Sequence, residues 1–371
     1  MNTNILCAVP FTKSWANSYG HFRNCCIADP QISSAPGQTF VQWWNSTELN
    51  SFRESLKESA LPAPCHKCAF KESNHAESFR NAVNKDVDFD NTDFSWPNRW
   101  DIEFGNKCNL ACWTCNETSS SLIMQHKKKI KILPESFRDP EIEFSKNWED
   151  IRLNFLKSYS MHDVVTLTAV GGEPMFNKKF LTFLQELIDL GLSSRTKLEI
   201  HTNGSYYNAR IEKLLSQNLW KYICVFVSVD AVGTKASWLR YGSDWKKIEA
   251  NIKKIQKLAN YVEIHCVLSV LNIGDLVDLK NFCSQLDLKL QVTPISRPEH
   301  MRLDAWHLDQ DLLCNKQDLV ESGYGEYYNL LGSKPDEKMY TRLQNYIKSF
   351  DTVRHPLRDV DSKLATALDL D

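Results

Sequence analysis

From about residue 97 onward, the apolar positions of the chain alternate between two spacings. Six short runs, rich in β-branched and aromatic residues, have the length and composition of strands. They span 99–104, 164–170, 197–201, 222–229, 261–270 and 288–293. Between most of them, apolar residues recur at helical spacing, in 180–190, 209–219, 245–259 and 275–286. This alternation predicts parallel strands joined by right-handed helical crossovers.

Six such units are too few to close a barrel of eight. We therefore expect an α/β fold in which residues 96–300 form an open, partial (β/α)6 barrel of the TIM type. The stretch at about 121–161 is longer than a simple crossover and predicts the first helix followed by a helical insertion. Residues 301–371 are polar and helical in pattern, which predicts a helical C-terminal extension.

Residues 1–95 differ from the rest because they are rich in turns, cysteine and aromatic residues. They predict a small separate N-terminal domain, in which Trp43-Trp44-Asn45-Ser46 would open a helix. The first ten residues have neither a charged start nor a long apolar stretch, so we expect no signal peptide and no membrane span. The formal net charge of -2 gives no indication of a nucleic-acid partner. We expect a cytoplasmic protein.

The twelve cysteines are many for a reducing compartment, where disulfides are rare. Clustered cysteines there indicate metal or redox chemistry. Eight lie within the first 115 residues: Cys7, Cys25, Cys26, Cys65, Cys68, Cys108, Cys112 and Cys115. Of the other four, Cys224 and Cys266 lie in apolar runs and are expected in the core.

The densest cysteine motif, Cys108-x3-Cys112-x2-Cys115, directly follows the first predicted barrel strand. In parallel βα folds the chemistry lies at this end of the strands. Three thiolates suit an iron-sulfur cluster, and they leave one iron without a protein ligand. The alternatives are half of a zinc ribbon or buried free cysteines. A zinc site usually closes with a fourth Cys or His, and none follows nearby.

This motif resembles the signature of the radical S-adenosylmethionine (radical SAM) superfamily. The resemblance implies a 4Fe-4S cluster held by the three cysteines, which would also be the catalytic residues. Its open iron would bind S-adenosylmethionine and cleave it reductively to a 5′-deoxyadenosyl radical that abstracts hydrogen from a substrate. The residue before the third cysteine is commonly aromatic in that family, whereas here it is Thr114.

Further motifs follow successive strands at the positions that the resemblance implies. Gly171-Gly172-Glu173-Pro174 would bind the amino group of the cofactor, and Arg240 its carboxylate. Taken alone, each motif is also compatible with an ordinary turn or a surface residue. The implied cofactor-binding residues are Thr114, Gly171, Gly172, Glu173, Asn203, Ser228, Asp230, Arg240 and Ser269.

The N-terminal cysteines form a second constellation, similar in order to the auxiliary-cluster domains called SPASM and twitch. The family usually places this domain after the barrel, but a subset from phages and bacteria resembles this chain throughout, including Asp351-x2-Arg354. The implied ligands of a second 4Fe-4S cluster are Cys7, Cys25 or Cys26, Cys65 and Cys68. Zinc remains an alternative, because the ligand types do not separate the two.

The resemblance implies a flavodoxin- or ferredoxin-type reductant and an enzyme that modifies a peptide or protein. Radical dehydrogenation or epimerisation of a sugar or other small metabolite is the alternative reaction. A non-catalytic zinc or iron-sulfur protein is the alternative of another class. The conjunction of the GGEP motif, Ser228-Val229-Asp230 and Arg240 at successive strand ends argues against it, because a metal scaffold needs none of these.

Overall fold

The computed structural model describes residues 5–58, 60–90, 92–305, 314–331, 336–350 and 352–370. All six predicted strands are present, with bounds that differ by only a few residues from the expected ones. They are β3 (Arg99–Glu103), β4 (Val165–Val170), β5 (Thr196–Thr202), β6 (Tyr222–Ser228), β7 (Tyr261–Leu268) and β8 (Lys289–Pro294). Each is parallel to the next, so the prediction of an α/β partial barrel is confirmed.

The N-terminal region extends this sheet by two strands that the sequence pattern did not predict. Strand β1 (Lys13–Ala16) lies parallel to β3, with Ser14 opposite Trp100, and β2 (Phe22–Arg23) pairs antiparallel with β1. The resulting order is β2-β1-β3-β4-β5-β6-β7-β8, with β2 and β8 as its edges. The barrel is therefore open, and one wall comes from the N-terminal region.

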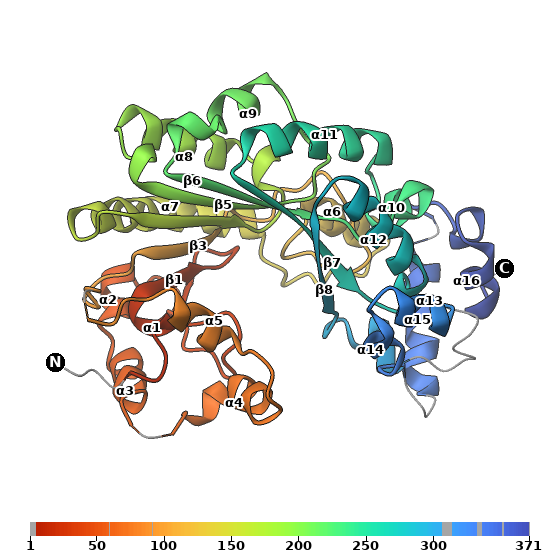
Figure 1. Cartoon of the computed structure of the whole chain (residues 1–371), viewed down its shortest axis with the longest axis horizontal. Helices are drawn as coiled ribbons and strands as arrows, with labels where there is room; N and C mark the ends of the chain where they lie inside the picture. The colour runs from red at the N-terminus through yellow and green to blue at the C-terminus, as the bar shows by residue number, and fades with distance from the viewer. Residues whose placement is uncertain are drawn as a thin grey trace.

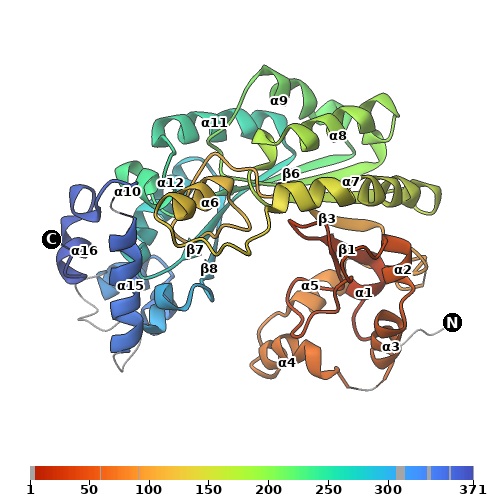
Figure 2. The same ribbon diagram turned by 180° about the vertical axis from the view of Figure 1, so that it is seen from behind.

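Helices cover the outer face of the sheet, as Figures 1 and 2 show from opposite sides. They are α7 (Pro140–Lys157), α8 (Lys178–Asp189), α9 (Ala209–Leu214), α11 (Trp245–Leu258) and α12 (Leu276–Gln285). Outward residues such as Leu198, Ile200 and Val225 are completely buried beneath them. On the inner face of β5, Lys197 is exposed and Glu199 is half-buried, so this face is polar and open.

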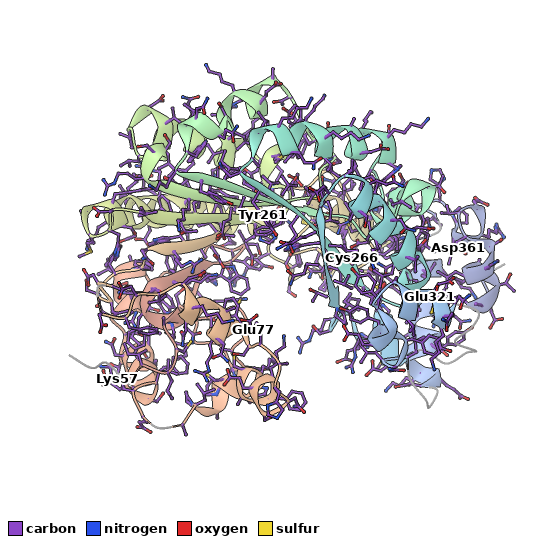
Figure 3. All side chains as sticks on the ribbon, viewed as in Figure 1. Lys57, Glu77, Tyr261, Cys266, Glu321 and Asp361 are labelled. Carbon is purple, nitrogen blue, oxygen red and sulfur yellow. The ribbon has the colours of Figure 1, made fainter. Side chains whose placement is uncertain are left out.

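Side chains on the two faces of β7 show the same division (Figure 3). Cys266 faces outward and is buried in the core. Cys224 is also buried, but it lies opposite Glu199 on the inner face. Tyr261 starts β7 on the half-buried face.

Short helices make up most of the N-terminal region: α1 (Val9–Thr12), α2 (Phe40–Trp44), α3 (Thr47–Ser55), α4 (His66–Ser73) and α5 (Phe79–Lys85). The expectation that Trp43 to Ser46 opens one helix is wrong. Trp43 and Trp44 end α2, and the Ser46 hydroxyl caps α3 by accepting the Leu49 amide. A serine before a helical run is a typical N-cap, which explains the break.

The predicted insertion contains α6 (Ser121–Lys129) and α7, which confirms its helical character. After the barrel come α13 (Lys316–Glu321), α14 (Gly325–Tyr328), α15 (Glu337–Ser349) and α16 (Ser362–Ala367). Asp351 lies outside the described residues. The boundaries at 95 and 300 stay predictions. No helix in the described ranges combines the length and apolar character needed to cross a bilayer.

Candidate active site

The three-cysteine loop at residues 108–115 connects β3 to α6. The segment after α10 (Gly233–Leu239) fixes its backbone. The Ala111 amide donates a hydrogen bond to the Tyr241 carbonyl at 2.8 Å, and the Trp113 amide donates to the Leu239 carbonyl at 3.0 Å. The loop is thus docked against the strand ends of the barrel, where the sequence placed it.

The thiols of this loop are shielded from water, and burial raises the pKa of Cys108, Cys112 and Cys115. The charge of Cys112 adds to this effect, and the pKa of Cys115 rises to about 12. Without a metal, all three are therefore protonated near neutral pH, and metal binding would release their protons. Within the described residues, no three His, Cys, Asp or Glu side chains are arranged to share one metal ion. In a cluster each thiolate binds its own iron, so the ligands lie further apart than around one ion.

Several buried hydrogen-bond donors around this loop have no acceptor in the described part of the chain. They are Nε1 of Trp113, Nε of Arg240, and all three guanidinium nitrogens of Arg354. Buried donors are rarely left unpaired, because each costs about 1–3 kcal/mol. An excess of donors over acceptors fits an anionic group, such as an iron-sulfur cluster or a cofactor carboxylate.

Gly171 and Gly172 end β4 with positive φ angles of 75° and 56°. A Cβ atom on Gly171 would lie 2.7 Å from the Glu103 Cβ, and one on Gly172 would lie 2.4 Å from the Lys107 carbonyl oxygen. In the structure the two glycines let β4 approach the end of β3 and the start of the cysteine loop.

Glu173 is 1% exposed, and both of its carboxylate oxygens accept hydrogen bonds. One accepts from the Met175 amide (2.9 Å) and the Thr202 hydroxyl (2.7 Å), and the other from the Asn203 amide (2.6 Å). Burial raises its pKa to about 7, although these bonds act in the opposite direction. Glu173 therefore links β4 to β5 by hydrogen bonds. Its remaining lone pairs can accept hydrogen bonds from an ammonium group.

Asn203 follows β5 and reaches the cysteine loop. Its amide nitrogen donates to Asn109 Oδ1 at 3.1 Å and lies 3.9 Å from the Cys108 sulfur. The side-chain oxygen Oδ1 of Asn203 accepts a hydrogen bond from the Ser205 hydroxyl at 2.6 Å. The Asn-Gly turn thus does more than reverse the chain, because it positions an amide beside the first cysteine.

Asp230 and Arg240 form a buried ion pair, with Arg240 Nη2 2.9 Å from Asp230 Oδ2. The other terminal nitrogen, Nη1, lies 3.9 Å from the Cys112 sulfur. Burial acts to lower the pKa of Arg240, but Asp230 and Cys112 outweigh it and raise the pKa. A permanently charged guanidinium therefore lies next to the second cysteine.

The remaining candidates are less directly placed. Ser228 and Thr114 are half-buried at the strand end and in the loop. Ser269 is completely buried, and its hydroxyl donates to Asn272 Oδ1 (2.9 Å) within its own turn. The side-chain amide nitrogen of Asn272 in turn donates a hydrogen bond to the backbone carbonyl of Asp230 at 2.9 Å. Ser269 is thus connected to the site through Asn272, and no contact of its own with the cysteine loop is among the described hydrogen bonds.

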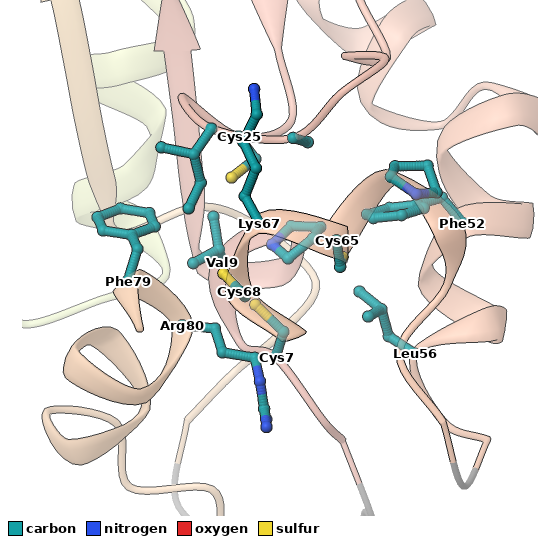
Figure 4. A pocket seen from close by; sticks show the side chains of 14 residues that line it. Cys7, Val9, Cys25, Phe52, Leu56, Cys65, Lys67, Cys68, Phe79 and Arg80 are labelled. Carbon is teal, nitrogen blue, oxygen red and sulfur yellow. The ribbon is translucent and has the colours of Figure 1, made fainter. Parts of the chain in front are cut away.

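The N-terminal cysteines gather in a pocket of the N-terminal region, shown in Figure 4. Cys7, Cys25, Cys65 and Cys68 line it together with Arg80, and Cys26 does not. A hydrogen bond from Cys26 is the main factor that lowers the pKa of Cys25, to about 6, whereas the same bond raises the pKa of Cys26. The geometry therefore distinguishes between two adjacent cysteines that the sequence left equivalent.

The family model that describes the radical SAM superfamily matches residues 102–283. This range contains the cysteine loop, the GGEP turn and Arg240. The chain therefore contains a radical SAM superfamily domain. It is therefore an enzyme, which answers the alternative of a non-catalytic metal-binding protein. No curated protein shows significant similarity to the chain.

Three solved structures of radical SAM proteins are similar to this radical SAM chain at low identity. Native anSMEcpe with bound AdoMet is 18% identical, with a TM-score of 0.41, over 69% of this chain and 66% of its own. Streptococcus suis SuiB is 16% identical (TM-score 0.40; 78% and 58% covered). SuiB bound to precursor peptide SuiA is 17% identical (TM-score 0.37; 82% and 57% covered). The chain described here covers less than two thirds of the length of each of these three proteins.

Sequence reasoning missed several residues of this radical SAM site. Asn109 and Asn272 hold the loop and the Asp230 turn, but no pattern marks an isolated asparagine. Arg354 was part of a noted motif without an assigned role. Trp113 was recognised only as an aromatic residue one place earlier than usual, although it packs at 4.9 Å against Trp238.

Proposed function

We propose that Cys108, Cys112 and Cys115 hold a 4Fe-4S cluster that cleaves S-adenosylmethionine reductively. When bound, the cluster would supply the electron that releases a 5′-deoxyadenosyl radical, which abstracts hydrogen from the substrate. The observation that carries this proposal is the conjunction, around the three loop thiols, of donors unpaired among the described residues with the Asp230–Arg240 pair.

The chain's own residues would bind and orient the cofactor. The fork of Arg240 suits its carboxylate, because a guanidinium pairs such an anion bidentately. Glu173 would accept a hydrogen bond from its ammonium group. Asn203, beside Cys108, provides an amide at the same end of the sheet. Thr114, Gly171, Gly172, Ser228 and Ser269 would complete the pocket as wall or backbone contacts.

The substrate that we propose is a peptide or protein segment. The open inner face of the sheet supports this, since it exposes polar side chains such as Lys197 and Gln291 rather than a closed apolar cavity. A flavodoxin- or ferredoxin-type protein would deliver the electron. No disulfide joins the described cysteines, which supports the cytoplasmic location that we propose.

The cleavage is tested with anaerobically reconstituted protein, S-adenosylmethionine and dithionite. We expect 5′-deoxyadenosine from the wild-type chain and none from a Cys108→Ala/Cys112→Ala/Cys115→Ala variant. Absence of 5′-deoxyadenosine from iron-loaded wild-type protein would contradict the proposal.

The substrate class is tested by deuterium transfer. Size fractions of a deuterated cell extract are added, and 5′-deoxyadenosine is examined by mass spectrometry. A peptide substrate predicts deuterium transfer from the peptide or protein fraction that protease treatment abolishes. Transfer from the small-molecule fraction would instead support the metabolite alternative.

We further propose that Cys7, Cys25, Cys65 and Cys68 bind a second 4Fe-4S cluster. The support is that these four line one pocket and Cys26 does not. With four protein ligands such a cluster would be saturated, which suits electron transfer. It could accept the second electron of a two-electron oxidation.

Iron analysis of the triple alanine variant separates this site from the first. Iron that remains supports an auxiliary cluster, and zinc in its place supports the other metal. On that background, Cys25→Ser should remove the remaining metal, and its neighbour Cys26→Ser should retain it. The reverse result would move the fourth ligand to Cys26.

A further inference from the structure

Arg354 follows α15 and lies against the outer side of the cysteine loop. It is 4% exposed, and Nε, Nη1 and Nη2 have no hydrogen-bond partner among the residues that the structure describes. Its guanidinium carbon lies 4.1 Å from the ring centre of Trp113, inside the loop, and 4.1 Å from that of Phe350. The side chain is thus held between the loop and the C-terminal extension.

This arrangement is costly unless an anion balances it, because a buried charge without a partner loses its hydration. No carboxylate of the described residues forms an ion pair with Arg354. Burial lowers its pKa to about 10, so it stays charged near neutral pH, and the Cys112 and Cys115 thiols partly oppose that lowering. Aromatic faces offset some of the cost, but they accept none of its five N–H hydrogen bonds.

Two other cations near the loop, Arg240 and Lys127, are neutralised by carboxylates. Arg240, on the inner side, pairs with Asp230 at 2.9 Å. Lys127 of α6 pairs with Glu117 at 2.6 Å. Of Arg240, Lys127 and Arg354, Arg354 is therefore the one whose charge no carboxylate of the described residues balances.

We propose that Arg354 is a positioning residue for the cluster: its unbalanced charge stabilises the reduced cluster and raises the reduction potential. One-electron reduction adds a negative charge inside the loop, and a cation fixed in a low-dielectric surrounding stabilises that charge more than it would in water. This inference rests on the proposed cluster at Cys108, Cys112 and Cys115, and it assigns a function to the C-terminal extension.

The test compares three variants of the full chain. Arg354→Met keeps an apolar stem against Trp113 and Phe350 but removes the charge. Arg354→Lys keeps the charge but removes the flat guanidinium. Arg358→Gln, an exposed arginine in the same segment, is the matched control. The readout is a redox titration that follows the paramagnetic signal of the reduced cluster, choosing the signal that changes when S-adenosylmethionine is added.

At a fixed donor potential, we expect Arg354→Met to lower the ratio of reduced to oxidised cluster by on the order of tenfold, which is ~59 mV for a one-electron couple. Arg354→Lys should stay near the wild-type value, and Arg358→Gln should equal it. The inference would be overturned if Arg354→Lys, which keeps the charge but loses the flat guanidinium, lowered the reduction potential as much as Arg354→Met. It would also be overturned if neither variant shifted the potential.

Two further outcomes keep the test decisive. Both Arg354 variants could fold, as judged by circular dichroism, and yet hold no iron. Arg354 would then be needed for the structure of the loop and not for the reduction potential, and the inference would be overturned. If wild-type protein itself binds no cluster at the cysteine loop, the proposed function fails instead, so the two failures are distinguishable.

Discussion

Gly172 has little room for a side chain, because the Lys107 carbonyl lies where a Cβ would be. We predict that Gly172→Ala destabilises the fold by about 3 kcal/mol or more and lowers the iron content, since the loop must shift. Gly191→Ala is the control: it has a similar φ of 69° but open space around it. It should cost only about 1 kcal/mol. Thermal unfolding and iron analysis measure both, and equal losses would contradict the steric argument.

The Asp230–Arg240 pair gives a second prediction for single residues. Asp230→Asn leaves a buried cation without its partner, so we expect a loss of about 3–5 kcal/mol in the free energy of unfolding. Adding Arg240→Met should recover part of this loss, because the unpaired charge is then gone. Urea unfolding of the two single variants and the double variant measures the coupling, and additive effects would show that the pair is not coupled.

The motifs selected the GGEP turn, Asp230 and Arg240 as candidates for cofactor binding, which stays a prediction. The partners of these residues were not predictable. Glu173 was expected to bind the cofactor's amino group, and its oxygens also accept hydrogen bonds from Thr202 and Asn203, which the sequence did not indicate. Such pairings depend on which strand is the neighbour, and the sequence records only the order of the strands.

Helix α15 and the cysteine loop form one packing unit through Trp113, Tyr346 and Phe350. We predict that Phe350→Ala costs about 3–5 kcal/mol and accelerates the loss of iron to a chelator, because Trp113 loses a wall. Lys348→Ala, on the exposed side of α15, should change stability by less than about 0.5 kcal/mol. If iron loss were as slow in Phe350→Ala as in the control, the packing would not support the loop.

Among the elements, periodicity identified all six barrel strands but neither β1 nor β2. Strand β1 has only four residues, and Ser14 pairs with Trp100, far along the chain. Such short segments carry too few positions to establish a period. The prediction that Trp43 to Ser46 opens a helix was wrong. It gave more weight to the aromatic residues than to Ser46, which caps the following helix.

The molecule as a whole should lose stability in mild acid. His300 is 5% exposed, and burial, with Arg342 nearby, lowers its pKa to about 4. Because an unfolded histidine titrates near 6.5, its neutral form stabilises the fold fully above that pH. This contribution is lost as the pH falls from about 6.5 toward 4. We predict that His300→Gln reduces the loss of stability between pH 7 and pH 5 by about 2 kcal/mol.

The control for this pH dependence is His75→Asn, at an exposed position with positive φ that asparagine tolerates. Its stability should fall with pH as the wild type does. Denaturant unfolding at several pH values measures both, and an unchanged slope in His300→Gln would show that His300 does not govern it.

The packing of Trp113 against α15 also orders events in time. The ribosome makes the cysteine loop early and residues 337–350 only after every barrel strand has emerged. Until then the indole of the loop lacks the cover of Tyr346 and Phe350, and a metal bound by the nascent chain would lie beside an incomplete protein wall. Loading with iron thus belongs after synthesis of α15, and a chain stalled before that helix would reach the assembly machinery with its site exposed to oxygen.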